Sequence, residues 1–329
     1  MESLIFAINA VSPIIAVVAI GYFIKKAGLV NGEFTKMANK LVFRLLLPSM
    51  LFLNIYKIQD IVSMDFGYII YVVAVLILVF FIAIALSMAV TPMGERRGVL
   101  VQAIFRSNYA LVGIPLAQSL FGESGAAVAT LLSAVFVPAL NILAVISLSI
   151  FRKGTQAPSI KKILLGIVKN PLIQSIALGI VVLFIRNFLK DAGIDFRLSD
   201  IPVIYTPLEY FSRSATPIAL IVLGAQFEFS AVRELRREII FGVLMRIVFV
   251  PALGIGAAYF FFSDVFSGAH FAAFVAAFAT PVAVSSVPMA QEMEGDTTLA
   301  GQLVVWTTIF SALSVFLASM LLKMAGIFS

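Results

Sequence analysis

Long runs of apolar residues recur along the entire chain, and short polar segments separate them. Apolar runs of about 18 or more residues are long enough to cross a lipid bilayer as helices. The polar segments near 152–162 and 188–203 are the longest, and neither is long enough for a soluble domain. The pattern therefore predicts an all-α polytopic membrane protein. Its ten predicted transmembrane helices, numbered here as spans 1 to 10, lie near residues 4–24, 34–56, 67–91, 97–121, 125–151, 163–187, 204–227, 238–262, 268–292 and 298–324.

The composition supports a membrane location and excludes several kinds of active site. Hydrophobic residues make up 61% of the 329 residues and charged residues 12%, about half the charged share of a soluble domain. The chain has no cysteine and a single histidine, His270. Disulfides, thiolate chemistry and multi-histidine metal sites are therefore excluded, and we expect neither a metal site nor a cofactor.

The basic residues indicate an orientation rather than a nucleic-acid partner. The net charge is +6, but Lys and Arg are dispersed in short clusters between the apolar runs, so we expect no nucleic acid. Fourteen of them fall on one side of the predicted membrane and five on the other. Because cytoplasmic loops carry the excess of Lys and Arg, we expect both termini outside the plasma (bacterial inner) membrane. The acidic Glu2 and the lack of a basic N-terminal region indicate that span 1 is a true span rather than a cleaved signal.

A ten-residue motif occurs twice, as IPLAQSLFGE at 114–123 and as VPMAQEMEGD at 287–296, with an offset of 173 residues. We therefore predict two five-helix repeats, 1–151 and 163–329, joined by a short cytoplasmic linker at 152–162. An odd number of helices per repeat inverts the second repeat in the membrane, an architecture typical of secondary transporters. Two further pairs of residues recur with equal spacing in spans five apart: Pro13 and Gly21 with Pro171 and Gly179, and Arg44 and Pro48 with Arg213 and Pro217.

Spans 4 and 9 carry polar residues in the middle of the apolar run. The offset of 173 places Ser107 opposite Thr280 and Asn108 opposite Pro281. Ser and Thr are preferred at helix N-caps and proline at the first helical position, so each span is predicted to be a half-helix, a break, a cap and a second half-helix. The alternative is an ordinary proline-kinked helix. The predicted site residues at the breaks are Arg106, Ser107, Asn108, Thr280, Pro281, Ser285 and Ser286. In each span a proline follows seven residues on, Pro115 after Asn108 and Pro288 after Pro281.

Four arginines fall within predicted spans, where a charge normally faces a cavity or a partner. Arg106 is predicted either to coordinate a carboxylate substrate or to bond backbone carbonyls freed by the break, or to snorkel. Arg44 and Arg213 form a repeat pair, for which a structural role is at least as plausible as a ligand role. Arg246 has no counterpart in the other repeat and is expected near an interface.

Acidic residues are absent from the centre of every predicted span; Glu209 and Glu292 lie near span ends. Proton and cation carriers usually keep a buried carboxylate there, so this absence favours an anionic substrate. Sodium coupling stays open, because hydroxyls and amides such as those of Gln118 and Gln291 can coordinate sodium. The alternative is that these two amides bond across helices.

Over essentially its whole length the chain resembles the auxin efflux carrier family. The resemblance is carried by LVFRLLLPSMLF in span 2, FRSNYALVGIPLAQSLFG in span 4, KNPLIQSIALGI in span 6 and ATPVAVSSVPMAQEM in span 9. It implies a scaffold of spans 1, 2, 6 and 7, a mobile transport domain of spans 3–5 and 8–10, crossing helices 4 and 9 at the substrate site, and a homodimer. Asn108 matches the family's carboxylate-contacting asparagine and Pro281 its second crossing proline, whereas Ser107 replaces the first. Bacterial members of the family are associated with small carboxylates.

We therefore predict a secondary transporter of a small organic anion, a carboxylate, that works by alternating access with an elevator-like movement in the lipid bilayer. The alternative within transport is a sodium-coupled symporter that resembles the bile acid transporters; coupling to Na⁺ or H⁺ and uniport both stay open. An intramembrane enzyme has little support, because the chain lacks an H-E-x-x-H motif and a paired acidic motif. A receptor role would leave the repeat unexplained.

Overall fold

The computed structural model describes residues 2–58, 66–151 and 160–328, and the regular elements of these residues are helices. Six helical segments among them are long and apolar enough to cross a membrane: Gly32–Tyr56, Phe66–Val90, Tyr109–Ile150, Pro171–Asp191, Arg236–Phe262 and Thr297–Met324. The elements are α1 (Glu2–Lys26), α2 (Gly32–Leu41), η1 (Val42–Leu46), α3 (Leu47–Tyr56), α4 (Phe66–Val90), α5 (Gly94–Phe105), η2 (Tyr109–Gly113), α6 (Ile114–Ile150), α7 (Ile160–Val168), α8 (Pro171–Asp191), η3 (Leu198–Asp200), α9 (Pro202–Gln226), α10 (Ala231–Glu234), α11 (Arg236–Leu244), η4 (Met245–Phe249), α12 (Val250–Phe262), α13 (Gly268–Phe278), α14 (Ser286–Glu292) and α15 (Thr297–Met324).

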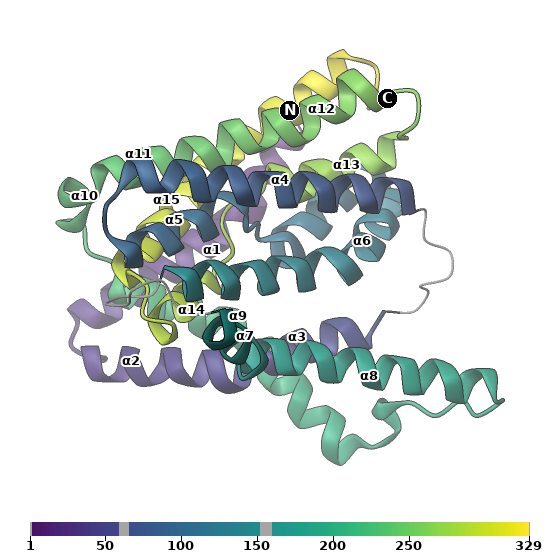
Figure 1. Cartoon of the computed structure of the whole chain (residues 1–329), viewed down its shortest axis with the longest axis horizontal. Coiled ribbons are helices and arrows are strands. Elements are labelled where there is room, and N and C mark those ends of the chain that lie inside the picture. The colour runs from purple at the N-terminus through teal and green to yellow at the C-terminus, as the bar shows by residue number, and fades with distance from the viewer. Residues whose placement is uncertain (1, 59–65, 152–159, 329) are drawn as a thin grey trace.

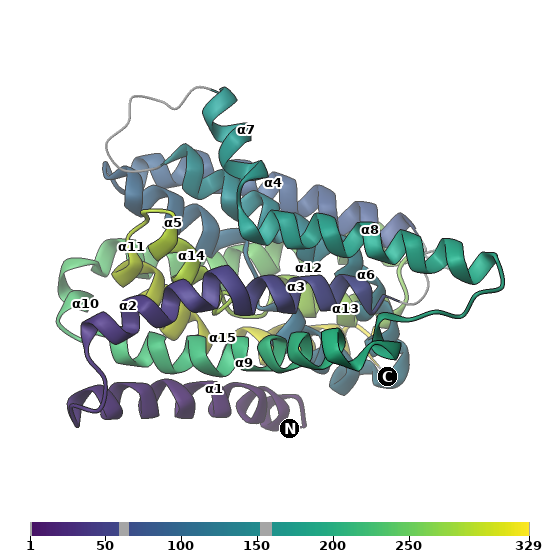
Figure 2. The same ribbon diagram turned by 90° about the horizontal axis from the view of Figure 1, so that it is seen from below.

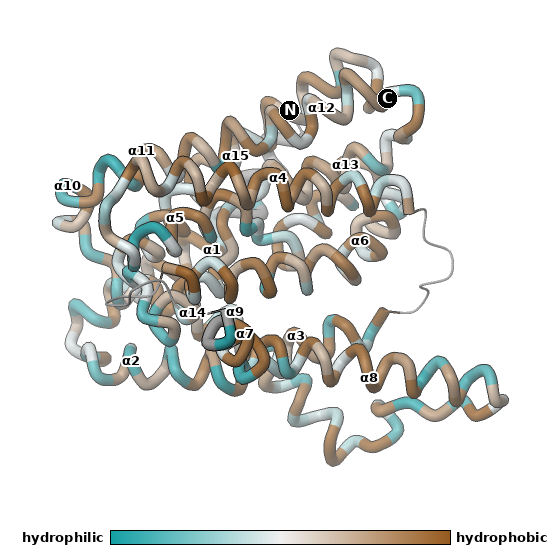
Figure 3. Tube along the Cα trace, in the orientation of Figure 1, coloured by the Kyte–Doolittle hydropathy of each residue, from teal (hydrophilic) through white to brown (hydrophobic). Residues whose placement is uncertain are grey.

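The outer surface of the helices is apolar. Figure 3 shows hydrophobic residues along most of the length of the long helices and hydrophilic residues gathered near their ends, for example beside α10. Large apolar side chains such as Phe81, Phe184 and Phe260 are exposed. An apolar surface of this extent is expected against lipid rather than water. The chain is therefore a multi-pass membrane protein.

Proline shapes three of the long helices. The π-helical segments η1, η2 and η4 are each followed, two residues after they end, by a proline: Pro48, Pro115 and Pro251. Proline has no N–H and its ring clashes with the carbonyl four residues earlier, so the preceding turn widens. The carbonyl of Ile247, four residues before Pro251, instead accepts a hydrogen bond from the hydroxyl of Ser314 on α15 at 2.7 Å.

Two segments that the sequence predicted as broken spans are interrupted in the structure. The helix α5 ends at Phe105 and η2 begins at Tyr109; α13 ends at Phe278 and α14 begins at Ser286. The helix α6 also departs from helical geometry at Phe121 and Gly122, whose φ is +60°. Glycine adopts this left-handed backbone without steric cost, and the turn lies where the sequence placed the loop between spans 4 and 5.

Span 6 differs from its prediction of 163–187. The segment divides into α7 and α8, with Lys169 and Asn170 between them. The side chain of Asn170 accepts a hydrogen bond from the backbone N–H of Leu172 at 2.9 Å, and Pro171 begins α8. An N-cap followed by proline is a strong helix start, so the apolar helix begins eight residues later than predicted. The predicted linker at 152–162 lies mostly outside the described residues.

The helices pack into two groups. In the first, α1 packs against α9, and α3 packs against both α8 and α9. In the second, α6 packs against α13, and α15 packs against α11 and α14. Figure 1 shows α2, α3 and α8 along the lower part of the molecule and α4, α11, α12 and α13 above them, and Figure 2 shows α1 and α9 side by side. The helix α1 also packs against α15 and so joins the two groups.

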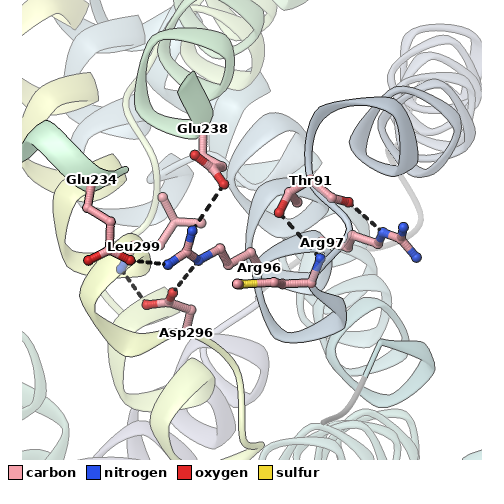
Figure 4. Close-up of polar contacts among 8 residues, drawn as sticks. Thr91, Arg96, Arg97, Glu234, Glu238, Asp296 and Leu299 are labelled. Carbon is pink, nitrogen blue, oxygen red and sulfur yellow. Dashed lines mark hydrogen bonds and ion pairs between the residues drawn. The ribbon is translucent and has the colours of Figure 1, made fainter. Parts of the chain in front are cut away.

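A cluster of charges holds one end of the second group together (Figure 4). The guanidinium of Arg96 on α5 lies 2.6 Å from Glu234, 3.3 Å from Glu238 and 3.0 Å from Asp296. Asp296 also caps α15, because its carboxylate accepts from the N–H of Leu299 at 2.9 Å. One arginine therefore links α5, α10, α11 and the start of α15.

Candidate functional site

The two helix breaks lie directly against each other. Ser107 and Val282 form an antiparallel bridge. The N–H of Asn108 donates to the carbonyl of Pro281 at 2.8 Å, and the N–H of Ala283 donates to the carbonyl of Arg106 at 3.3 Å. Non-helical backbone at membrane depth is tolerated only where protein or a cavity satisfies its polar groups. The breaks meet this requirement by bonding to one another.

The remaining backbone groups at the crossing find side-chain partners. The N–H of Val282 donates to the hydroxyl of Thr307 on α15 at 3.1 Å. On the opposite side, the guanidinium of Arg246, which is fully buried, donates to backbone carbonyls of both broken segments. Its acceptors are the carbonyls of Thr280 at 2.9 Å, Ala277 at 3.1 Å, Ile104 at 3.2 Å and Phe105 at 3.3 Å.

Arg106 is buried at the first break, with 3% of its surface exposed. Its guanidinium donates to the side-chain oxygens of Asn141 at 2.7 Å, Ser285 at 2.9 Å and Ser286 at 3.4 Å. The side chain therefore does not snorkel, and no carbonyl freed by the break is among these partners. Among the described residues no carboxylate forms an ion pair with Arg106. A buried charge without a counter-charge is costly, so the arrangement is suited to an anion that arrives from outside the chain.

Ser107 and Asn108 hold unused hydrogen-bonding groups at the same place. The hydroxyl oxygen of Ser107 and the side-chain nitrogen of Asn108 are both buried and have no hydrogen-bond partner. Buried polar groups in native proteins are almost always paired, so an unpaired one needs an explanation. A ligand with oxygen acceptors would satisfy the Asn108 nitrogen and leave the nearby Arg106 charge neutralised.

The predicted caps are wrong in detail. Thr280 was expected to cap the second half-helix of span 9, but its hydroxyl donates back to the carbonyl of Ala276 at 2.8 Å. Pro281 was expected at the first helical position, but α14 begins only at Ser286, and neither Ser285 nor Asn108 caps the following helix with its side chain. The reason is tertiary: Pro281 and the two residues after it use their backbone groups to bridge to the other break and to α15.

The prolines seven residues after Asn108 and after Pro281 lie where the predicted half-helices continue. Pro115 lies in the first turn of α6, after the π-helical segment η2. Pro288 lies in the first turn of α14. At Pro288 a missing N–H costs no helical hydrogen bond, whereas Pro115 continues the helix of η2, whose turn widens to accommodate it.

A cavity opens beside the crossing. Its volume is about 190 Å³, enough to hold several water molecules. Arg106, Ser107, Asn108 and Ser285 line it from the breaks, whereas Arg246 lies behind the crossing and does not. The polar side chains of Asn54 on α3, Asn141 on α6 and Thr216 on α9 also line the cavity.

The motif glutamines have different partners. Gln291 on α14 accepts from the side-chain nitrogens of Asn39 at 2.7 Å and Gln226 at 3.1 Å, and donates to the carbonyl of Lys36 at 3.2 Å. We call Asn39, Gln226 and Gln291 the amide cluster. Gln118 instead donates to nearby Glu123 at 2.8 Å. Gln291 therefore bonds across helices, as the second of the two alternatives predicted.

The arginines outside the crossing lie at helix surfaces. The side chain of Arg44 is 64% exposed and lies 3.4 Å from Glu292, next to the amide cluster. The side chain of Arg213 is 77% exposed and lies 3.5 Å from Glu209. Neither lines the cavity. The expectation that Arg246 lies near an interface is wrong, because it is fully buried at the crossing.

The sequence did not lead us to assign Arg246 or Thr307 to the crossing. A signal for Arg246 was present: it is a mid-span arginine in a chain without mid-span acids, and two helix breaks free carbonyls that need donors. Thr307 gave no comparable signal, because a threonine that bonds its own helix backbone is common in membrane helices.

Comparison with known proteins assigns the chain to a family. The family model described as membrane transport protein matches residues 6–319. An uncharacterised transporter of Methanothermobacter thermautotrophicus is 24% identical over 95% of this chain and 98% of its own length. An uncharacterised transporter of Methanocaldococcus jannaschii is 26% identical over 64% of this chain and 66% of its own length. The chain belongs to the membrane transport protein family, the auxin efflux carrier family that its motifs resemble.

Proposed function

We propose that the protein is a secondary transporter of a small organic anion with a carboxylate group. One observation carries this proposal: Arg106 is buried at the crossing and lines the cavity without a carboxylate partner among the described residues. The unpaired side-chain nitrogen of Asn108 lies at the same cavity. A carboxylate would accept hydrogen bonds from both groups, and charge-assisted bonds of this kind are among the strongest in proteins.

The size and polarity of the cavity favour a small substrate. A volume of about 190 Å³ accommodates a carboxylate of a few carbon atoms. Much of the lining is apolar, with Leu51, Leu140 and Ala219 among its residues. The side chains of Asn54 and Thr216 offer hydrogen bonds to a second polar group, which suits a mono- or dicarboxylate.

We propose that the architecture is that of ten transmembrane helices in two inverted repeats, with α5 to α6 and α13 to α14 as the two broken helices. The paired breaks lie at positions related by the 173-residue offset of the duplicated motif. The scaffold would consist of α1, α2, α3, α8 and α9, and the transport domain of α4 to α6 and α11 to α15. The close packing within each group supports this division, and α1 against α15 is the main helix contact between the groups.

Transport by alternating access requires the two groups to move past each other. At one end of the cavity they are joined by polar contacts: the amide cluster, which links α14 with α2 and α9, and the pair of Arg44 with Glu292. With both termini outside the membrane, as the loop charges favour, this end is the cytoplasmic one. The described state would then be closed to the cytoplasm.

The amide cluster gives a test of this movement. The chain has no cysteine, so a variant with Asn39→Cys and Gln291→Cys carries only the two introduced thiols. A short bifunctional thiosulfonate reagent is expected to join them and to stop uptake into proteoliposomes, and a reductant is expected to restore it. A matched pair, Ile247→Cys and Ser314→Cys, joins η4 and α15 within the transport domain and should stay active when crosslinked. Full uptake by the crosslinked first pair would contradict a relative movement of α14 and α2.

Replacing Asn108 by alanine tests the substrate site. A hydrogen bond to a charged group contributes about 1.5–3 kcal/mol, so the affinity for the carboxylate should fall by roughly 10- to 150-fold. The measurement is equilibrium binding by the purified protein together with uptake into proteoliposomes. Thr130→Ala, which removes a hydroxyl from α6 at a residue that does not line the cavity, is the control. Unchanged binding and uptake by the Asn108→Ala protein would show that the proposed site is wrong.

The remaining features are also proposals. Because of the loop charges, we expect the chain in the cytoplasmic membrane with both termini outside. Because of the family resemblance, we expect a homodimer formed through the scaffold. Coupling to sodium is the alternative to uniport, and replacing sodium in the uptake medium distinguishes the two.

A further inference from the structure

The buried guanidinium of Arg246 lies where the two broken helices end. The helix α5 ends at Phe105 and α13 ends at Phe278. Arg246 bonds the carbonyls of Ile104 and Phe105 at the first end and of Ala277 and Thr280 at the second, with distances of 2.9–3.3 Å. The four hydrogen bonds use the Nε and both terminal nitrogens, so every nitrogen of the guanidinium bonds to the two breaks.

The charges at this place balance. The C-terminal end of a helix carries a partial charge of about −0.5, so two such ends present about one negative charge. A single guanidinium supplies one positive charge. Among the described residues no carboxylate pairs with Arg246, so the helix ends are its counter-charge. Arg246 is fully buried and does not line the substrate cavity, so it is not available to the substrate.

Freed carbonyls and the C-terminal ends of broken helices are the groups with which secondary transporters hold a coupling cation. Here they are already occupied by a cation that belongs to the chain. We propose that Arg246 is a tethered substitute for a coupling cation: it holds the crossing together in every state of the cycle, and transport therefore proceeds without sodium at this position. Arg246 is a positioning residue for the crossing, and it acts on the substrate only through the two breaks.

The uptake test of this inference rests on the proposed function. The stability test with added cations does not. Wild-type stability in detergent, without substrate, is expected to be the same in sodium as in an equal concentration of N-methylglucamine. Removing the guanidinium in the Arg246→Ala protein leaves four carbonyls without a donor. The variant is expected to melt at a lower temperature, and sodium or free methylguanidinium should restore part of the loss because each can enter the vacated space.

Uptake gives the second readout. Uptake by the Arg246→Ala protein should become sodium-dependent. Sodium should stimulate it by roughly 5- to 150-fold, the range usual for coupling between two sites. Arg246→Lys keeps the charge and should stay sodium-independent. The matched control is Arg213→Ala, which removes an exposed arginine from α9 and should change neither stability nor sodium response.

Several outcomes would overturn the proposal. Sodium that stabilises the wild-type protein or stimulates its uptake would overturn the proposal, because Arg246 would then not have replaced the coupling cation. This test does not require any variant to fold. A folded Arg246→Ala protein that responds to neither sodium nor methylguanidinium would reduce Arg246 to an ordinary packing residue. If no carboxylate is transported but the binding results are as expected, the proposed function fails while the inference about Arg246 stands.

Discussion

Replacing Arg106 by glutamine is expected to lower the affinity for the transported carboxylate by roughly 30- to 5,000-fold. Truncating one partner of a buried, hydrogen-bonded charge pair costs about 2–5 kcal/mol. Glutamine can still bond Asn141 and Ser285, the neighbours of the guanidinium, so the substitution removes the charge with little change in volume. The measurement is a binding isotherm with the purified protein, repeated as the concentration dependence of uptake.

Two comparisons make this result specific. Arg106→Lys keeps the positive charge but loses the planar fork, so it should retain more affinity than Arg106→Gln. Arg213→Gln removes an arginine that is also within a predicted span but is 77% exposed, and it should bind as wild type does. If Arg106→Gln binds the carboxylate as well as the wild-type protein, the anion does not sit at this guanidinium.

Replacing Gly224 by leucine is expected to prevent assembly of the scaffold. The helices α1 and α9 cross so closely at this glycine that an added Cβ would overlap the carbonyl oxygen of Val18. Gly21 makes the reciprocal approach, because its added Cβ would overlap the carbonyl of Ile221. Both obstacles are backbone atoms, which cannot rotate away. The cost should reach or exceed the upper end of the about 1–3 kcal/mol typical of overpacking.

The readout for this variant is the amount of monodisperse protein in detergent and its melting temperature. Gly256→Leu on α12 is the matched control, because an added Cβ there meets nothing within 4 Å. It replaces a glycine in a helix with a better helix former and should be as stable as wild type or more so. Equal yield and melting temperature for the two variants would show that the close approach of α1 and α9 does not limit stability.

The long helices could be predicted from the sequence because lipid-facing surfaces must be apolar over a fixed length. The apolar run predicted at 67–91 corresponds to α4 at Phe66–Val90, and the run at 298–324 to α15 at Thr297–Met324. Span 6 was misplaced because apolarity alone does not separate α7 from α8. The residues that do so, Asn170 and Pro171, act through capping rather than hydrophobicity.

At the crossing, the sequence located the breaks but not their partners. The duplicated motif and the polar residues Ser107 and Asn108 marked where the helix is interrupted. The capping roles predicted for Thr280 and Pro281 were wrong because the backbone after Thr280 bonds to segments more than 20 residues away in the chain. Arg246 was not assigned to the crossing for the same reason: the carbonyls that it binds are 31 to 142 residues away.

The most direct test of the account is solute counterflow in proteoliposomes with a panel of mono- and dicarboxylates and the corresponding uncharged amides. The wild-type protein is expected to exchange at least one small carboxylate and not its amide, and the Arg106→Gln protein is expected to lose this exchange. Exchange of the amide at the same rate as the carboxylate, or of the carboxylate by Arg106→Gln at the wild-type rate, would contradict an anion site at the crossing of the two broken helices.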